Sequence, residues 1–493
     1  MIGMTRDTLS SMWPFTSRTH TNEHPELFLT NTLSGKKERF VSLRPNAATL
    51  YSCGPTVYDR ASIGNLRAYV FADTLARALS YAGYKVQRVI NITDVGHLVA
   101  DAEQGEDKMD STAKREHKTP QEIAAHYTGL FFNDIQALNI DASDITFPRA
   151  TEYIREQIAM VETLEGQGFA YPADDGIYFD TSKFPGYGKL GGIDTSTLQA
   201  GARITTTSSK RHPHDFALWR FAKAGDLQQW DSPWGKGNPG WHIECSAMSR
   251  ALLGPEIDIH TGGIDHIGVH HNNEIAQSEA LTQKPFVRYW MHNAFLTMTG
   301  EKISKSLGNV FYISDITARG IHPLALRYFF LQAHYRTPLA FSWDALAGAA
   351  EALTRLWRIA KETRREAAGK SAHSSAQTEF AALLMDDLAT PQAIGLLWET
   401  LRDQSLSAAE RLGILDAADK LLGLSLENPP LPETFSLSEL PDAIRLIAEE
   451  RETARKARDF READRLRAEI ETRGYRVDDR PEGTVFSPIL TTR

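Results

Sequence analysis

Cysteine is scarce in this chain, whose 493 residues contain only Cys53 and Cys245. Two cysteines cannot form a disulfide framework, so we expect a reducing compartment in which a thiol is free to bind metal. No apolar run approaches the roughly 18 residues that span a bilayer, and the N-terminus lacks the layout of a secretory signal. We therefore expect a cytoplasmic protein with no membrane partner.

An excess of positive charge is also absent. The formal net charge is -9, which argues against a protein that coats polyanions, although a local basic face can coexist with an acidic total. Hydrophobic residues make up 42% and charged residues 24% of the chain, as in ordinary globular proteins. A chain of this length can bury a large core and should form two or three domains.

The second cysteine lies among other potential metal ligands. Cys245 ends the run Gly-Trp-His-Ile-Glu-Cys, and the run His-His-Asn-Asn-Glu follows from His270 to Glu274. Thiolate, imidazole and carboxylate are ligands that Zn2+ accepts, and residues at i and i+4 share one helix face. If Cys53 folds back to the same point, it completes a set of four. The alternative is two buried structural thiols beside a solvated histidine pair, and these residues alone leave both open.

Residues 47–93 follow the pattern of a βαβ unit. The sequence predicts a short strand over 50–53, a helix over 63–81 and a second strand over 86–92. Such a unit implies a parallel sheet, which binds ligands outside the carboxyl ends of its strands. Cys53 and Thr93 both fall at ends of this kind.

Three glycine-containing turns are candidates for nucleotide binding. Ser62 to Asn65 opens the predicted helix at a point suited to phosphate, and Gly262 to Asp265 offers a carboxylate for ribose hydroxyls. Lys302 to Asn309 carries lysines that can follow a triphosphate while its charge redistributes. Taken singly, each turn is equally compatible with a packing glycine or a solvated loop.

From Pro323 onward the apolar spacing is helical. It predicts helices over 324–331, 343–360, 378–385 and 391–401, with a polar loop over 365–377. A proline-rich break at 428–432 predicts a linker. Beyond it, 443–473 reads as a charged helix or helix pair, whose arginines form either a solvated, salt-bridged face or a nucleic-acid footprint.

In their order and spacing these segments closely resemble cysteinyl-tRNA synthetases, a family of class I aminoacyl-tRNA synthetases, over about residues 27–486. The blocks that carry the resemblance are Tyr51–Asp59, Asn91–Asp94, Gly240–Met248, Asp258–Gly263, His270–Glu274 and Lys302–Asn309. The resemblance implies an α/β fold in which a Rossmann-like, parallel-sheet catalytic domain over 26–322 is followed by a helical-bundle domain over 323–427. A small tRNA-binding segment over 428–493 would follow, and we expect residues 1–25 to be a frayed extension.

The resemblance also implies a function. Such an enzyme activates L-cysteine with ATP and Mg2+ to cysteinyl-adenylate and transfers the cysteinyl group to the 3' end of tRNA(Cys). One zinc ion per chain, bound to Cys53, Cys245, His270 and Glu274, would select the substrate sulfur. Editing would then be unnecessary, and we expect no long inserted domain. We expect the chain to act as a monomer.

The remaining site residues come from the same resemblance. The amino-acid pocket would be lined by Gly54, Thr93, Trp241 and His260. ATP would contact Gly64, Gly263, Asp265 and Lys305. The catalytic set would be Ser62, Asn65, Lys302 and Lys305.

One departure from the family pattern concerns the signature His-Ile-Gly-His, which here has Ser62 and Asn65 in its outer places. If the first histidine stabilises the transition state, losing that donor costs on the order of 3 kcal/mol, about a hundredfold in rate. His97, His266 or Arg67 could supply a substitute.

Two alternative functions are compatible with the same residues. The first is a paralogue that passes cysteine to a small amine, and the presence of the helical and C-terminal regions argues against it, because such an enzyme would not require them. The second is a catalytically weakened tRNA-binding relative, and the presence of Lys302, Lys305 and the complete ligand set argues against it for the same reason. A zinc hydrolase is excluded, because the His-Glu-x-x-His pattern is absent and four protein ligands leave no place for a hydrolytic water.

Overall fold

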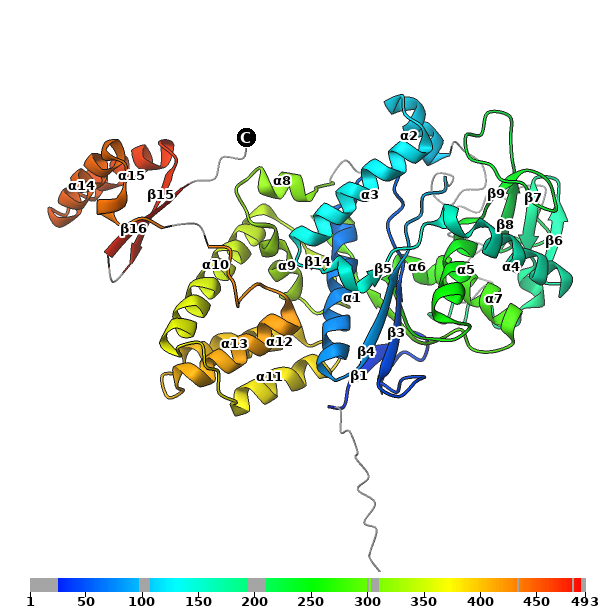
Figure 1. Cartoon of the computed structure of the whole chain (residues 1–493), viewed down its shortest axis with the longest axis horizontal. Helices are drawn as coiled ribbons and strands as arrows, with labels where there is room; N and C mark the ends of the chain where they lie inside the picture. The colour runs from blue at the N-terminus through cyan, green and yellow to red at the C-terminus, as the bar shows by residue number, and fades with distance from the viewer. Residues whose placement is uncertain are drawn as a thin grey trace, which may run out of the picture.

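The computed structural model describes residues 25–96, 107–193, 210–298, 301–302, 310–431, 434–480 and 483–488. A five-stranded parallel sheet in the order β11-β10-β3-β4-β5 is built from strands between residues 47 and 293 (Figure 1). Every neighbouring pair is parallel, which confirms the predicted sheet type. The strands are β3 (Ala47–Ser52), β4 (Lys85–Ile90), β5 (Ile145–Thr146), β10 (Ile257–Gly263) and β11 (Val287–Asn293).

The strand order reverses beside β3. The chain runs outward from β3 through β4 to β5 and later returns to β10, which pairs with β3 on its other side. Leu50 then lies opposite Ile259, and Ser52 lies opposite Thr261. Ligands of doubly wound sheets bind at such a reversal, outside the carboxyl ends of the strands. Cys53 is the first residue after β3, so the topology places it at this point.

Helix α1 (Ile63–Tyr81) has the predicted bounds. It joins β3 to β4 as the crossover of a βαβ unit, and Leu66, Val70, Leu75 and Leu79 are buried in the core that it shares with the sheet. The strand β4 ends at Ile90, two residues before the predicted end. The predicted unit is confirmed, with an error of two residues at this strand end.

A second sheet follows β5 along the chain, and the sequence did not predict it. Four strands between residues 170 and 239 form an antiparallel sheet in the order β6-β7-β8-β9, at the far end of the molecule from the helical bundle (Figure 1). Its strands are β6 (Ala170–Ala173), β7 (Gly176–Phe179), β8 (Phe216–Phe221) and β9 (Gly237–Pro239). All four residues of β7 are buried, so the strand shows no alternation of polar and apolar residues that would predict it.

Further strands and helices complete this part of the chain. The strands β1 and β2 form a hairpin, and a three-stranded sheet has the order β13-β12-β14. These strands are β1 (Phe28–Asn31), β2 (Lys36–Arg39), β12 (Leu296–Met298), β13 (Glu301–Lys302) and β14 (Leu339–Ala340). The helices are α2 (Lys108–Glu116), α3 (Pro120–Ala137), α4 (Ile154–Gly166), α5 (Trp241–Leu253), α6 (Asp265–Gly268), α7 (His270–Thr282) and α8 (Ile313–Thr317).

A helical bundle follows, as predicted. Its helices are α9 (Pro323–Leu331), α10 (Trp343–Glu366), α11 (Ser375–Met385), α12 (Thr390–Arg402) and α13 (Ala408–Leu422). The polar loop between α10 and α11 is shorter than predicted, because α10 continues to Glu366 and α11 already begins at Ser375. The apolar period thus located α9 to α12 but missed the polar turns at their ends, and α13 was not predicted.

The bundle meets α1 at a buried carboxylate. Asp73, which is 1% exposed, accepts hydrogen bonds from Arg327 of α9 at 2.7 Å, from Arg77 at 2.7 Å and from Arg88 of β4 at 3.2 Å. Burial alone would raise the pKa of Asp73, but the three guanidinium groups outweigh burial and hold the pKa well below 3.8. This ion cluster ties the helical bundle to the central sheet.

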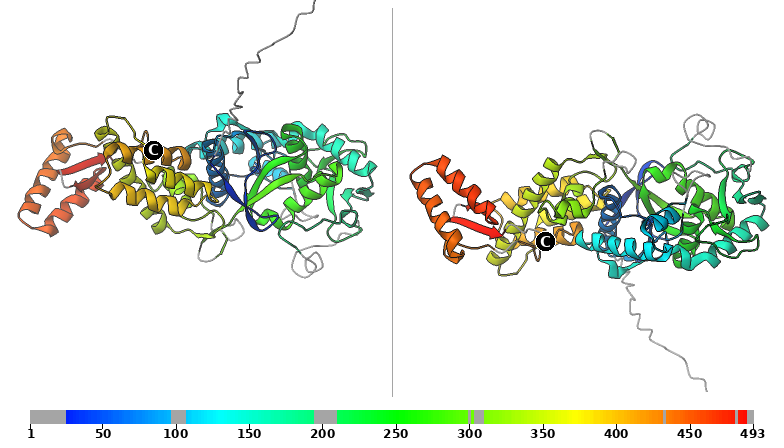
Figure 2. Two further views of the ribbon diagram at one scale, coloured as in Figure 1. Left: turned by 90° about the horizontal axis from the view of Figure 1, so that it is seen from below. Right: turned by 90° about the horizontal axis from the view of Figure 1, so that it is seen from above.

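The C-terminal residues form a separate lobe beyond α10 (Figure 2). The charged region is a helix pair, α14 (Asp442–Lys456) and α15 (Phe460–Thr472), packed on the hairpin β15 (Tyr475–Arg480) and β16 (Gly483–Pro488). Arg358 of α10 contacts Asp478 of β15 at 2.8 Å. Searched over the described ranges, the chain has no helix long and apolar enough to cross a membrane.

Candidate active site

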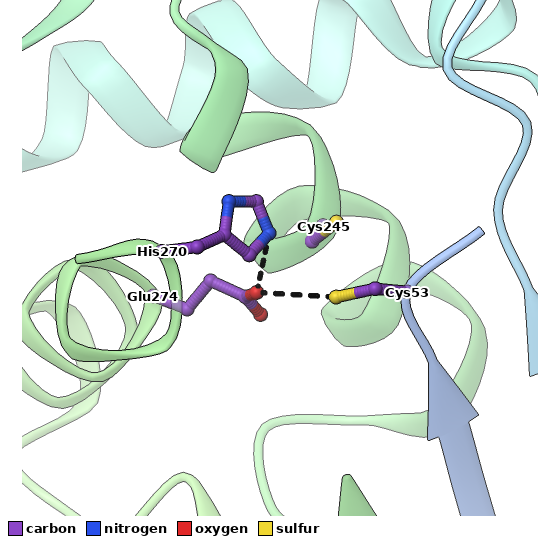
Figure 3. A group of neighbouring side chains, drawn as sticks. All are labelled: Cys53, Cys245, His270 and Glu274. Atoms are coloured by element: carbon purple, nitrogen blue, oxygen red, sulfur yellow. Dashed lines mark hydrogen bonds and ion pairs between the residues drawn. The ribbon is translucent and has the colours of Figure 1, made fainter. Parts of the chain in front are cut away.

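Four potential metal ligands meet at the strand reversal (Figure 3). Cys53 follows β3, Cys245 lies in α5, and His270 and Glu274 lie in the first turns of α7. One ligand atom from each lies within 4.8 Å of all the others. His270 Nε2 is 2.9 Å from Glu274 Oε1, and Cys53 Sγ is 4.0 Å from the same oxygen. The structure thus brings together the four side chains predicted from the sequence, and the donor set suits a tetrahedral Zn2+ site.

The bend that carries Cys53 into the site requires glycine. A Cβ atom on Gly54 would lie 1.5 Å from the backbone oxygen of Asn91 at the end of β4. The Gly54 N–H donates to Asn91 Oδ1 at 2.8 Å, and the same oxygen is 3.7 Å from Cys245 Sγ. Asn91 therefore links the two cysteine-bearing segments.

Two buried histidines contact the ligands Glu274 and His270 and fix their orientation. His260 Nε2 is 2.9 Å from Glu274 Oε2, and His242 Nδ1 is 2.8 Å from His270 Nδ1. Partners of this kind fix the orientation of metal ligands. We predicted His260 for the amino-acid pocket; the structure places it against Glu274, with its side chain fully buried. His242 was missed, although its position three residues before Cys245 on α5 was a usable signal.

A third histidine approaches the first cysteine. His271 Nε2 lies 3.3 Å from Cys53 Sγ, and His271 Nδ1 lies 2.7 Å from His292 Nε2. Cys53, His260, His271 and Glu274 form a second group of potential ligand atoms within 4.8 Å of one another. The second group shares Cys53 and Glu274 with the first, so the two groups overlap and are not independent sites.

Burial and neighbouring groups shift the pKa values of the ligands in different directions. A hydrogen bond from Cys53 lowers the pKa of Cys245 to about 7 against the effect of burial, while burial and Cys245 raise the pKa of Cys53. Burial would raise the pKa of Glu274, but His260 and His270 lower it to about 2. Cys245 is therefore the more acidic of the two thiols, and binding of a divalent cation would release the protons that the thiols hold.

The other predicted pocket residues surround this cluster. The ring of Trp241 lies 5.0 Å from that of His270. Thr93 Oγ1 donates to Glu244 Oε2 at 3.0 Å and accepts from Asn91 Nδ2 at 3.0 Å. The Thr93 hydroxyl is thus fully engaged within the protein and orients Glu244.

The first nucleotide-binding turn is a capping box at the start of α1. Ser62 Oγ accepts from the Asn65 N–H at 3.3 Å and donates to Asn65 Oδ1 at 2.8 Å. The Ser62 N–H also donates to Asn65 Oδ1, at 3.0 Å, while Gly64 between them is half-buried. The serine that departs from the family signature therefore acts as the N-cap of the helix.

The other nucleotide-binding candidates are only partly described. Gly263 ends β10, and exposed Asp265 opens α6 so close to it that a Cβ on Gly263 would lie 2.3 Å from Asp265 Oδ1. The backbone of Lys302 ends β13. The Lys302 side chain, Lys305 and the rest of that loop to Asn309 lie outside the described residues.

Three residues were named as substitutes for the missing signature histidine. Arg67 cannot serve, because its guanidinium is buried and bonded to backbone carbonyls. Burial, with a contribution from His270, lowers the pKa of His266 to about 4, so this side chain is neutral at pH 7. His97 lies outside the described residues.

Comparisons with known proteins agree with this geometry. The sequence model of the class I (C) tRNA synthetase catalytic domain matches residues 39–351. A cysteine–tRNA ligase of Treponema denticola is 42% identical over 496 residues, covering 94% of this chain and 100% of that protein. Cysteine–tRNA ligase 1 of Burkholderia lata is 45% identical over 462 residues, covering 93% of this chain and 96% of that protein.

A solved structure shares the fold. The Mycobacterium tuberculosis methionyl-tRNA synthetase bound by methionyl-adenylate superposes with a TM-score of 0.55 at 14% identity, covering 77% of this chain and 93% of that one. With this fold and with relatives that match along nearly their whole length, the chain belongs to the class I (C) tRNA synthetase family, the family of the cysteine–tRNA ligases.

Proposed function

We propose that the chain is a cysteine–tRNA ligase. The carboxylate of L-cysteine attacks the α-phosphorus of ATP to give cysteinyl-adenylate and pyrophosphate. A ribose hydroxyl at the 3' end of tRNA(Cys) then takes the cysteinyl group and releases AMP. The observation that carries the proposal is the convergence of two thiols, an imidazole and a carboxylate at the strand reversal of the sheet, in a chain of this family.

The ligand group gives the amino-acid specificity in this proposal. A zinc ion held by Cys53, Cys245, His270 and Glu274 would bind the thiolate of cysteine in preference to the hydroxyl of serine. The protein's own contribution is to hold the ligands: His260 fixes the carboxylate, and His242 fixes the imidazole. Gly54, Thr93 and Trp241 would line the pocket for the rest of the amino acid.

ATP, with Mg2+, would lie across the amino end of α1. Ser62, Gly64 and Asn65 form its first turn, and Lys302 and Lys305 would approach the phosphates from the β13 side. Gly263 and exposed Asp265 would contact the ribose. Catalysis in this arrangement depends on positioning and on charge stabilisation, so no covalent nucleophile is required.

The other predictions form part of the same proposal. Residues 26–322 would be the catalytic domain, 323–427 the helical domain and 428–493 the segment that binds tRNA. Two free thiols suit a reducing compartment such as the cytoplasm. All four ligands come from one chain, so a monomer suffices. Relatives matched along nearly their whole length do not favour a paralogue with a small-amine acceptor.

The test is cysteine-dependent exchange of pyrophosphate into ATP, with L-serine in parallel, followed by charging of total tRNA. Cys245→Ser should lower the zinc content and raise the KM for cysteine. Ser246→Ala is the matched control, because Ser246 follows Cys245 on α5 and its hydroxyl donates to Gln277 of α7, so it is not a ligand. Unchanged zinc stoichiometry in Cys245→Ser would reject the ligand assignment, and absence of exchange in the zinc-loaded wild type would reject the activity.

A further inference from the structure

Arg67 of α1 is buried without a carboxylate partner. Its side chain is 2% exposed, and among the described residues no Asp or Glu forms an ion pair with it. Nη1 donates to the carbonyl oxygens of Ala294 at 2.9 Å and Phe295 at 2.8 Å. Nη2 donates to those of His334 at 3.3 Å and Thr337 at 2.7 Å. One guanidinium group therefore binds four carbonyls from two chain segments.

Both segments lead into the three-stranded sheet. Ala294 and Phe295 directly precede β12, and Thr337 precedes β14, which pairs with β12 in parallel. On its other side β12 pairs with β13, the strand that ends at Lys302. Arg67 thus holds the start of the strand pair that carries the lysine signature.

A second bond joins α1 to the chain after that signature. The N–H of Ile63, the first residue of α1, donates to the Phe311 carbonyl at 2.9 Å. Ile63 and Arg67 are at i and i+4, on one face of the helix. The first two turns of α1 therefore hold the chain before β12 through the Arg67 side chain and after β13 through the Ile63 N–H.

The chemistry of the group fits a positional role. Burial lowers the pKa of Arg67 to about 10, so the side chain stays charged at neutral pH although no carboxylate compensates for its burial. An apolar side chain of similar volume would avoid that cost. A planar group with five donors in a fixed fork can instead set the relative position of two backbone segments.

We propose that Arg67 is a positioning residue for adenylate formation, which holds the β12–β13 hairpin at a fixed distance from the amino end of α1. The proposal rests on the proposed function, in which these two elements contact the phosphates of ATP. A displacement of about 1 Å in such a site can cost about a hundredfold in rate.

The test compares Arg67→Gln and Arg67→Lys with the wild type in cysteine-dependent pyrophosphate exchange. We expect Arg67→Gln to lower kcat about a hundredfold and to raise the KM for ATP, with zinc content and the KM for cysteine unchanged. Lysine keeps the charge but cannot span both segments, so Arg67→Lys should lose about tenfold. Hydrogen exchange of Leu296–Met298 should accelerate in both variants, and that of α7 should not.

Arg327→Gln is the control for the loss of a buried arginine, because Arg327 is also fully buried and donates to backbone carbonyls, although it pairs with Asp73 as well, at the junction with the helical bundle. We expect its kcat per folded molecule to stay within about threefold of the wild type. Equal losses of kcat in Arg67→Gln and Arg327→Gln would overturn the proposal. If Arg67→Gln does not fold, a normal kcat in Arg67→Lys would overturn it instead.

A wild type without pyrophosphate exchange would reject the proposed function. Normal hydrogen exchange of Leu296–Met298 in Arg67→Lys would show that Arg67 does not hold β12 in place.

Discussion

Replacing Ser62 by histidine should change both the free energy of unfolding and the activation free energy of adenylate formation. Ser62 is 7% exposed, and its hydroxyl caps α1 through two hydrogen bonds with Asn65. Losing an N-cap costs about 1 kcal/mol of stability. A histidine that donates to the transition state would contribute about 3 kcal/mol, or about a hundredfold in rate. Because the first value acts on the free energy of unfolding and the second on the activation free energy, we expect Ser62→His to form adenylate faster while unfolding at a lower temperature.

The assay is single-turnover formation of cysteinyl-adenylate beside thermal unfolding of the same preparation. Ser407→Ala is the control for the loss of a cap, because Ser407 forms the same capping box with Glu410 at the start of α13, in the helical bundle. It should lose a similar amount of stability without a change in rate. A rate in Ser62→His equal to or below that of the wild type would refute the reasoning and show that the turn works as a serine–asparagine pair.

Three further predictions concern the metal bend, the ion cluster and the C-terminal lobe. Gly54→Ala must displace the Asn91 carbonyl, so we expect zinc affinity to fall at least about tenfold, whereas Gly129→Ala, which meets open space in α3, should leave it unchanged. Asp73→Asn should destabilise the fold by about 3 kcal/mol at pH 7 in denaturant titrations. Because the folded pKa of Asp73 lies well below 3.8, this difference should shrink as the pH falls below about 4, and a constant difference would contradict the assignment. Truncation after Asn428 should weaken tRNA charging and spare pyrophosphate exchange; equal losses would make the lobe structural.

The sequence was informative where a pattern is local. The bounds of α1 follow from its apolar period and its glycine stop, and the pairing of His270 with Glu274 follows from helix geometry alone. The approach of Cys53 to Cys245 was predicted only through the family resemblance, because the residues alone left a structural role for both thiols open.

It was uninformative where burial removes the pattern. The strand β7 is buried on both faces and therefore shows no alternation. Isolated histidines such as His292 carry no periodic signal, so their role behind the ligands required coordinates. Arg67 was misassigned by its charge, although its spacing from Ile63 and Phe71 along one helix face already indicated burial.

The four metal ligands are far apart in the sequence, so the site is complete only late in the synthesis of the protein. Glu274 lies 221 residues beyond Cys53, so at 5–20 residues per second the ribosome adds it about 10 to 45 s after the first cysteine. Throughout that interval Cys53 belongs to a nascent chain that lacks the carboxylate, and its thiol is open to competing metals and oxidants. Metal binding contributes to the free energy of folding only when all the ligands are present. Zinc can therefore stabilise this domain only after α7 has been synthesised.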